Sequence, residues 1–344
     1  MASTAGRMQT LVCEAPGKIG LEWRPVPLRG EDQVLVRVRR AGICGTDYHI
    51  FSGLHPFLSY PRLIGHELSG TVEQAPEGSR LRPGQIVAIE PYLACGTCHA
   101  CRQGKTNCCT RLAVLGVHVD GGMCEWLVMP EPYVHPVDGL SLDQAAMIEF
   151  IAIGAHAVRR AGALAGRQAL VVGAGPIGIA TALMARIAGA EVTLADLDLG
   201  RLRLAAALVE GAATIHVGPD PVPEPAKAGH DAGFETVFDA TGNRSAMERG
   251  FSLVAHGGLY VLVGVIKDDI TFSDSEFHKR EMTLMASRNA TQEDFTHVID
   301  SIRRGLIPTD GLLTHRTTLA DAPRNLAEWT LRKEGLIKAL IDIA

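Results

Sequence analysis

The chain has 344 residues, of which 47% are hydrophobic and 21% are charged, so it can bury a large core and is long enough for two domains. Its 33 Lys and Arg against 38 Asp and Glu give a formal net charge of −5 without basic runs, which argues against a nucleic-acid-binding protein. The segment from Met1 to Gly6 is small and polar, and no apolar run is long enough to span a bilayer. We therefore expect a cytoplasmic protein without a membrane role.

The first part of the chain, from Leu11 to about Val137, has the texture of an all-β, barrel-like domain. Short apolar bursts such as residues 34–38 and 86–89 are separated by Gly and Pro, as is typical of short strands joined by turns.

A cluster of cysteines with the spacing C-x2-C-x2-C-x7-C lies within this β-rich part. Four thiolates at such a spacing can surround one tetrahedral Zn²⁺ in a closed, structural site. Five of the eight cysteines of the chain fall between Cys95 and Cys109, which favours metal ligation in a reducing compartment over a disulfide framework. The candidate ligands are Cys95, Cys98, Cys101 and Cys109, and Cys108 beside the last of them leaves its register open.

From Gln168 onward the pattern changes to strand, glycine turn and helix. Residues 169–172 read as a buried strand, and Ile177, Ala180, Met184 and Ile187 recur at helical spacing. Later segments predict a parallel sheet buried on both faces, with strands at 191–195, 235–239 and 258–263, a helix at 201–208 and a loop at 219–225. The tail after about Thr291 is mixed and could rejoin the first domain.

The glycine turn predicts a dinucleotide site because it follows a strand and opens a helix. Gly173, Gly175 and Gly178 let the backbone approach a pyrophosphate, and the helix N-terminus, with Pro176 and Ile177 in its first turn, offers free N–H groups. Asp196, at the end of the second strand, can bind both ribose hydroxyls and would repel a 2′-phosphate, so NAD is favoured over NADP. The alternative is a plain tight turn with a solvated acid.

Further cofactor contacts are expected from the same domain. Arg201 can stack on the adenine or be an ordinary surface arginine. The other expected cofactor residues are Thr241, Val263, Gly264, Val265, Ser287 and Arg288.

A second set of metal-ligating side chains lies outside the cysteine cluster. Cys44, His66 and Glu67 supply a sulfur, an imidazole and a carboxylate. Each taken alone is more often a packed or surface residue than a ligand.

The order of these motifs resembles the zinc-dependent medium-chain dehydrogenase family, in its sorbitol and threonine dehydrogenase-like branch, over nearly the whole chain. The motifs are Gly42-Ile-Cys-Gly-Thr-Asp47, Gly65-His-Glu-Leu-Ser-Gly70, the four clustered cysteines and Gly173-Ala-Gly-Pro-Ile-Gly178. The resemblance implies an α/β protein with a GroES-like β-barrel catalytic domain at 1–152, to which 291–344 returns, and a Rossmann-fold doubly wound parallel sheet at 153–290. It also implies two Zn²⁺ per chain, NAD, Cys108 as a bystander, and a homodimer or homotetramer.

The resemblance places a third catalytic zinc ligand just before the nucleotide domain, where this chain has Glu149. The usual Glu-Pro pair is here Glu149-Phe150. Whether Glu149 or Glu67 binds the metal directly stays open, and an acid at a helix start is the alternative for Glu149.

By the same resemblance, zinc with three protein ligands lowers the pKa of a substrate hydroxyl, and hydride passes to NAD. Thr46 passes the released proton by way of the nicotinamide ribose to His49. Asp47 holds the far nitrogen of His66. Helix-cap or turn chemistry is the alternative for Thr46, His49 and Asp47.

Several stretches outside the general family pattern resemble bacterial sugar-acid dehydrogenases. They imply oxidation of a secondary hydroxyl of an aldonate, of the L-galactonate or L-gluconate type at C5, to a keto acid. We expect Arg288 to grip the carboxylate, with pyrophosphate contact as its rival role, and His118 to bind a sugar hydroxyl or to be a buried structural histidine. Glu149 belongs to the same expected substrate site. The stretches are 56–62, 106–109, 116–122, 272–279, 287–291 and 313–316.

Two other functions stay open at this point. A neutral polyol or L-threonine dehydrogenase would use the same zinc and NAD. A catalytically silent nucleotide-binding protein would keep the scaffold without the chemistry.

Overall fold

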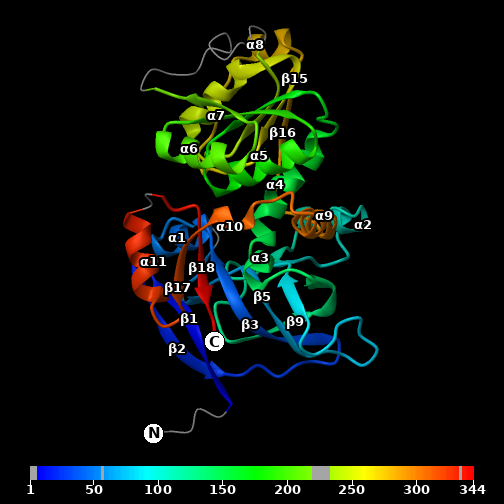
Figure 1. Cartoon of the computed structure of the whole chain (residues 1–344), viewed down its shortest axis with the longest axis vertical. Helices are drawn as coiled ribbons and strands as arrows, with labels where there is room; N and C mark the ends of the chain where they lie inside the picture. Colours follow the sequence, from blue (N-terminus) through cyan, green and yellow to red (C-terminus); the bar gives the residue numbers. More distant parts are fainter. Residues whose placement is uncertain (1–5, 56–57, 219–232, 333–334) are drawn as a thin grey trace. The chain divides into compact units, whose positions relative to one another are not determined.

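The computed structural model describes residues 6–55, 58–218, 233–332 and 335–344, and the chain divides into two compact units (Figure 1). Unit 1 comprises Met1–Glu149 and Thr291–Ala344, and unit 2 comprises Phe150–Ala290. The boundary expected at 152/153 falls inside a continuous helix, α4 (Ile148–Ala161), so the units are not separated there by a loop. The loop expected at 219–225 lies outside the described residues.

Unit 1 is built mainly from antiparallel strands. One sheet has the order β2-β1-β4, and a second, seven-stranded sheet has the order β10-β6-β5-β3-β18-β17, with β9 paired to β3. A further pair, β7 with β8, carries the chain toward the cysteine cluster. The strand bounds are β1 Arg7–Ala15, β2 Lys18–Pro25, β3 Gln33–Ile43, β4 Arg62–Leu63, β5 Glu67–Gln74, β6 Ile86–Ile89, β7 Tyr92–Leu93, β8 Ala113–Val114, β9 Trp126–Pro130, β10 Val134–Pro136, β17 Leu313–Thr318 and β18 Lys338–Asp342.

The last strand of the chain is inserted beside one of the first. β18 pairs antiparallel with β3, with Ala339 opposite Ile43, and parallel with β17. Figure 1 shows this red strand next to the blue β3. The C-terminal segment therefore completes the sheet of unit 1. The helices of this unit are α1 Gly45–Phe51, α2 His99–Arg102, α3 Leu142–Ala146, α9 Gln292–Arg303, α10 Thr309–Leu312 and α11 Ala322–Leu331.

Unit 2 is a six-stranded parallel sheet with the order β13-β12-β11-β14-β15-β16. The strand order reverses beside β11, and in open parallel sheets such a reversal leaves a crevice for a ligand at the carboxyl ends of the strands. Its elements are β11 Gln168–Val172, α5 Pro176–Ile187, β12 Glu191–Asp196, α6 Leu199–Leu208, β13 Ala213–His216, β14 Phe234–Asp239, α7 Arg244–Gly250, β15 Val254–Leu262, α8 Asp274–Lys279 and β16 Thr283–Ala286.

The apolar strands of unit 2 are buried because helices pack on the sheet. Ala169, Leu170 and Val171 of β11 are fully buried, as expected of a parallel strand covered on both faces. Together with the β-rich unit 1, this sheet confirms the predicted α/β fold class. Within the described ranges no helix is both long enough and apolar enough to cross a bilayer.

Candidate active site

Three of the predicted ligands come together in unit 1. Cys44 lies between β3 and α1, His66 directly precedes β5, and Glu67 is the first residue of β5. One ligand atom from each lies within 4.8 Å of the others. Cys44 is half-buried, whereas His66 and Glu67 are buried.

Two glycines make room for this arrangement. Gly65 has a φ of +103°, a left-handed conformation that suits glycine and turns the chain into His66. Gly42 lies opposite Glu67 in the β3–β5 ladder, and a Cβ at this position would clash with the Glu67 carboxylate. The motif glycines are therefore part of how the ligands are presented.

Asp47 caps helix α1, and the predicted hydrogen bond to His66 is not formed. Its Oδ2 accepts the backbone N–H of Cys44 at 2.8 Å, which is the helix-cap alternative. Asp47 Oδ1 and His66 Nδ1 are both buried and have no hydrogen-bond partner within the described part of the chain. The expected hydrogen bond from His66 Nδ1 to Asp47 is therefore not formed among the described residues, although Asp47 Oδ1 remains unpartnered.

The cluster is electrostatically suited to a cation. Burial lowers the pKa of His66, but Cys44, Asp47 and Glu149 outweigh burial and raise this pKa well above its usual value. Acidic groups that hold a proton on a buried imidazole would also favour a divalent metal at the same point. Sulfur, nitrogen and carboxylate oxygen are the donor types that zinc takes in catalytic sites, so these residues fit Zn²⁺.

Lys338 forms a buried ion pair with Glu67. Its Nζ donates to both Glu67 oxygens, at 2.6 and 2.7 Å, and both residues are almost completely buried. Burial lowers the pKa of Lys338, but Glu67 and Cys44 raise it above its ordinary value overall. Sequence reasoning missed Lys338, because it lies 271 residues from Glu67 and has no motif around it.

Glu149 lies in the first turn of α4 and is buried, although it is outside the 4.8 Å group. The Tyr92 hydroxyl donates a hydrogen bond to Glu149 Oε1. Burial, together with the nearby charge of Glu67, raises the pKa of Glu149 to about 7, against the lowering effect of His66. Thr46 and His49 of the predicted proton relay both lie on α1, the first half-buried and the second exposed.

The four predicted structural cysteines also converge. The sulfurs of Cys95, Cys98, Cys101 and Cys109 all lie within 4.8 Å of one another, and none of them is in a disulfide. Cys108 is exposed and is not part of the group. Four mutually close thiols match the donor set of a tetrahedral, closed Zn²⁺ site.

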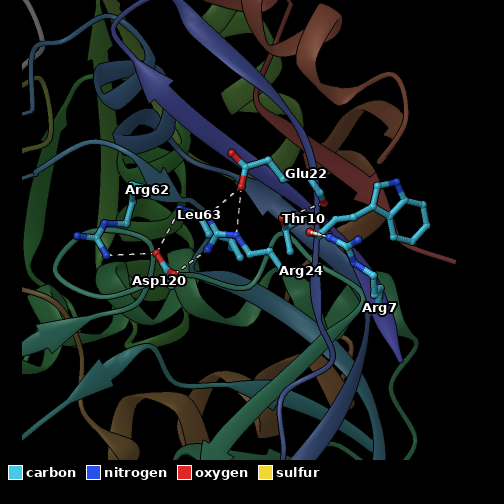
Figure 2. Close-up of polar contacts among 8 residues, drawn as sticks. Arg7, Thr10, Glu22, Arg24, Arg62, Leu63 and Asp120 are labelled. Carbon is cyan, nitrogen blue, oxygen red and sulfur yellow. Dashed lines mark hydrogen bonds and ion pairs between the residues drawn. The ribbon is translucent and has the colours of Figure 1, made fainter. Parts of the chain in front are cut away.

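The loop that carries His118 is anchored next to the predicted ligand His66. Gly121 and Gly122 donate their N–H groups to the carbonyls of Leu63 and Gly65, at 2.8 and 2.9 Å. Figure 2 shows Arg24 and Arg62 both directed at the Asp120 carboxylate, at 2.9 and 3.3 Å.

His118 itself is exposed, so the alternative of a buried structural histidine is wrong. Its Nδ1 accepts the N–H of Val114 at 3.2 Å, which orients the ring.

The glycine turn of unit 2 opens onto a pocket of about 380 Å³. Gly173, Gly175, Asp196, Arg201 and Thr241 of the predicted cofactor set line it. The pocket also includes residues that sequence reasoning missed, among them Leu197, Asn243 and Arg249. Leu197 directly follows β12 and Asn243 is the N-cap of α7, whereas Arg249 lies in the last turn of α7 and had no sequence signal.

The glycine turn closes tightly on itself. A Cβ at Gly178 would clash with the carbonyl oxygen of Gly173. Gly175 is the N-cap of α5, and Pro176 and Ile177 form its first turn. Asp196 is tied to the turn, since its Oδ2 accepts the N–H of Ala174 at 2.6 Å. The unit therefore has the close backbone approach and the helix N-terminus that a dinucleotide pyrophosphate needs.

The remaining predicted cofactor residues lie at the ends of β15 and β16. Val263 and Gly264 both donate their N–H groups to the Asp239 carbonyl, and Val265 is 88% exposed. Ser287 is buried and donates its N–H to Leu262, and Arg288 next to it is exposed. Both follow β16 in unit 2.

Comparison with known proteins agrees with this site. The model of the alcohol dehydrogenase GroES-like domain matches residues 30–139, and the zinc-binding dehydrogenase model matches residues 176–304. The chain therefore belongs to the zinc-dependent medium-chain dehydrogenases, and the predicted family, GroES-like and Rossmann fold, and zinc and NAD-type cofactors are confirmed.

Among individual relatives, a sugar-acid dehydrogenase is similar over nearly the whole chain. The chain is 42% identical to L-galactonate-5-dehydrogenase of Escherichia coli (strain K12) over 340 residues, which cover 97% of this chain and 98% of the relative.

Two solved structures cover 98% of this chain and 99% of their own. One is the RspB alcohol dehydrogenase of E. coli CFT073 with NADH, at 30% identity and a TM-score of 0.91. The other is a zinc-binding dehydrogenase of Sinorhizobium meliloti 1021 with NADP, at 28% identity and a TM-score of 0.88.

Proposed function

We propose that the chain oxidises a secondary hydroxyl of a sugar acid to a keto acid, with NAD as the hydride acceptor. The aldonate would be of the L-galactonate or L-gluconate type, oxidised at C5. The observation that carries the reaction type is the convergence of Cys44, His66 and Glu67 within 4.8 Å. The substrate class is supported by the 42% identity to L-galactonate-5-dehydrogenase over nearly the whole chain.

Each side chain of the cluster has a proposed task. Cys44 and His66 hold the metal, and one of the two glutamates, Glu67 or Glu149, supplies the third contact. When bound, Zn²⁺ supplies Lewis acidity that lowers the pKa of the substrate hydroxyl. Thr46 and His49 carry the released proton away from the hydroxyl.

The cofactor unit has its own proposed tasks. The first turn of α5 binds the pyrophosphate through its N–H groups. Asp196 accepts hydrogen bonds from the ribose hydroxyls and repels a 2′-phosphate. Arg201 stacks on the adenine, and the residues after β15 and β16 bind the nicotinamide end.

Two side chains are proposed to recognise the sugar acid. Arg288 is an exposed guanidinium, which can hold a carboxylate with two parallel hydrogen bonds. His118 is exposed and oriented through its Nδ1, and it would bind a sugar hydroxyl. We further propose that the protein works in the cytoplasm as a homodimer or homotetramer, in line with its cysteine usage and its family.

A substrate panel with NAD tests the proposed function. We expect NADH formation with aldonates, L-galactonate and L-gluconate first, and identification of a keto acid as the product. Preferential turnover of sorbitol, galactitol or L-threonine would replace the sugar acid by a neutral polyol or an amino acid. No NADH with any alcohol, together with a single zinc per chain, would identify a silent nucleotide-binding protein.

The Arg288→Ala variant tests the carboxylate contact separately. Loss of one charge-assisted contact should raise KM for the aldonate by about tenfold or more and leave the KM of a neutral polyol nearly unchanged. Equal impairment of both substrates would remove the carboxylate role and leave pyrophosphate binding.

A further inference from the structure

Tyr92 is a buried residue whose hydroxyl donates a hydrogen bond to Glu149, one of the predicted zinc ligands. It is 3% exposed and lies in β7, opposite Val114 of β8. Its ring contacts Phe295 edge to face, with centroids 6.4 Å apart. A phenol has a single proton to donate, and that proton goes to Glu149 Oε1.

The packing around Tyr92 holds this hydroxyl in place. Phe295 is fully buried and stacks on His135, with ring centroids 5.0 Å apart. His135 in turn lies 2.9 Å from the buried carboxylate of Glu90 through its Nε2. The ring of Tyr92 therefore packs against an ordered group and cannot turn away from Glu149 without disturbing it.

The two glutamates of the site accept hydrogen bonds from donors of different charge. Glu67 receives the Lys338 ammonium on both oxygens, so its charge is already compensated. Glu149 receives a neutral phenol on one oxygen, so this contact orients the carboxyl group without bringing a positive charge to it. By distance, Glu67 belongs with Cys44 and His66. By charge, however, Glu67 is already neutralised by Lys338, so Glu149 is the glutamate better able to bind a metal cation.

We propose that Tyr92 is a positioning residue that fixes the Glu149 carboxylate toward the catalytic zinc, so that Glu149 rather than Glu67 serves as the third protein ligand. The inference rests on the proposed zinc-dependent reaction. Hydrogen-bond donors behind a metal ligand set its orientation, and their loss costs about 10- to 100-fold in metal affinity or activity. Tyr92 would have this role through its hydroxyl alone.

Cobalt exchanged into the catalytic site tests the proposal without substrate. Tyr92→Phe removes only the hydroxyl and keeps the ring that packs on Phe295. We expect altered visible absorption of the Co²⁺ protein and catalytic-site metal affinity about tenfold weaker or more, with the structural zinc retained. Tyr133→Phe is the matched control, since the Tyr133 hydroxyl, in the same unit, bonds backbone groups: it accepts the N–H of Ala94 at 3.0 Å and donates to the Ala94 carbonyl at 3.4 Å.

A double variant shows whether Tyr92 acts through Glu149. In the Glu149→Gln background, adding Tyr92→Phe should change neither the Co²⁺ spectrum nor the metal affinity further. Wild-type values in Tyr92→Phe, or full additivity in the double variant, would overturn the proposal. If Tyr92→Phe does not fold, Glu149→Gln decides alone, because an unchanged spectrum there removes Glu149 as a ligand.

These outcomes are separable from the substrate question. A Co²⁺ spectrum that changes in Tyr92→Phe, in a protein that oxidises no sugar acid, would remove the proposed substrate and keep the role of Tyr92. If the wild-type protein oxidises aldonates and the Co²⁺ spectrum is unchanged in Tyr92→Phe, the proposed substrate is kept and the role of Tyr92 is removed.

Discussion

At the scale of single residues, the buried charges of the site depend on one another. Glu67 and Lys338 are 0% and 1% exposed, and each is the other's compensating charge. A buried ion pair of this kind contributes little net stability, but removal of one partner leaves an uncompensated buried charge.

Lys338→Met should therefore be strongly destabilising. We expect a loss of about 3–5 kcal/mol in the free energy of unfolding, because Glu67 stays buried without its cation. Urea unfolding of the zinc-loaded protein measures it. The double variant Glu67→Gln with Lys338→Met should lose less than the sum of the two single variants, and simple additivity would mean that the pair is not coupled.

Asp196 is the residue that should decide between the two nicotinamide cofactors. Asp196→Ala removes the carboxylate that we propose accepts hydrogen bonds from the ribose hydroxyls and repels a 2′-phosphate. We expect the ratio of kcat/KM for NAD over NADP to fall by about tenfold or more, as expected for the loss of a charged hydrogen-bond partner. Steady-state kinetics with both cofactors measure this ratio, and an unchanged ratio would refute the assignment.

At the scale of elements, charged side chains join α3 to the sheet of unit 1. Asp143 of α3 accepts hydrogen bonds from Arg40 of β3, at 2.7 Å, and from Arg316 of β17. Asp342 of β18 pairs with the same two arginines. This network joins the N-terminal and C-terminal strands of the unit.

The network should make the stability of unit 1 depend on pH. Burial raises the pKa of Asp143, but Arg316 and Arg40 outweigh it and hold the pKa below its ordinary value. A depressed native pKa contributes stability above the unfolded pKa of about 3.9, and this stability is lost as the pH falls through the native pKa.

Asp143→Asn should thus cost up to about 1 kcal/mol at pH 7, a modest value because the side chain is partly exposed, and nearly nothing at low pH. Urea unfolding at both pH values measures the difference. The exposed Asp310 of α10 supplies the control Asp310→Asn. An equal cost of Asp143→Asn at both pH values would exclude the charge as the cause.

Zinc binding and stability of the cysteine loop around α2 should require the four clustered sulfurs but not the sulfur of Cys108. Cys109→Ser removes a buried ligand, so we expect the variant to lose one zinc per chain and to fold or assemble poorly. Cys108→Ser changes the exposed neighbour and should keep both zinc ions and the wild-type melting temperature. Metal analysis with thermal unfolding compares the two, and the opposite pattern would shift the ligand register by one residue.

At the scale of the whole molecule, the candidate metal sites and the candidate cofactor pocket lie in different units. The ligand clusters lie in unit 1, and all the residues that line the cofactor pocket lie in unit 2. The two binding functions should therefore be separable by mutation.

Cys44→Ala should lose catalysis and one of two zinc ions per chain, and still bind NADH. Metal analysis, NADH fluorescence titration and turnover measure the three properties on one preparation. The remaining zinc would be the one in the cysteine cluster. Retention of two zinc ions would show that Cys44 is not a ligand, and loss of NADH binding would show that the units are not independent.

Candidate site residues could be predicted from the sequence alone where they form a pattern of closely spaced residues. Four cysteines within fifteen residues and a glycine turn between a strand and a helix are short-range patterns. The four sulfurs converge, and Gly173 and Gly175 of the turn line the pocket. Cys44 and His66 were accessible only because their motifs resemble those of a family. The hydrogen bond predicted between Asp47 and His66 is not formed, and Asp47 instead accepts the Cys44 N–H through Oδ2 within the first turn of α1.

Only the tertiary structure shows which side chains donate hydrogen bonds to the two glutamates of the candidate site. Tyr92 lies 57 residues from Glu149, and Lys338 lies 271 residues from Glu67, and neither is part of a recognisable motif. Lys338 reaches the site because β18 pairs with β3, and Tyr92 because β7 and Phe295 hold its ring. The sequence by itself indicated the family, the four-cysteine cluster and the cofactor turn, and the last two are local patterns of residues. The charge and orientation of each glutamate depend on strand pairing and burial, which arise only when distant segments pack together.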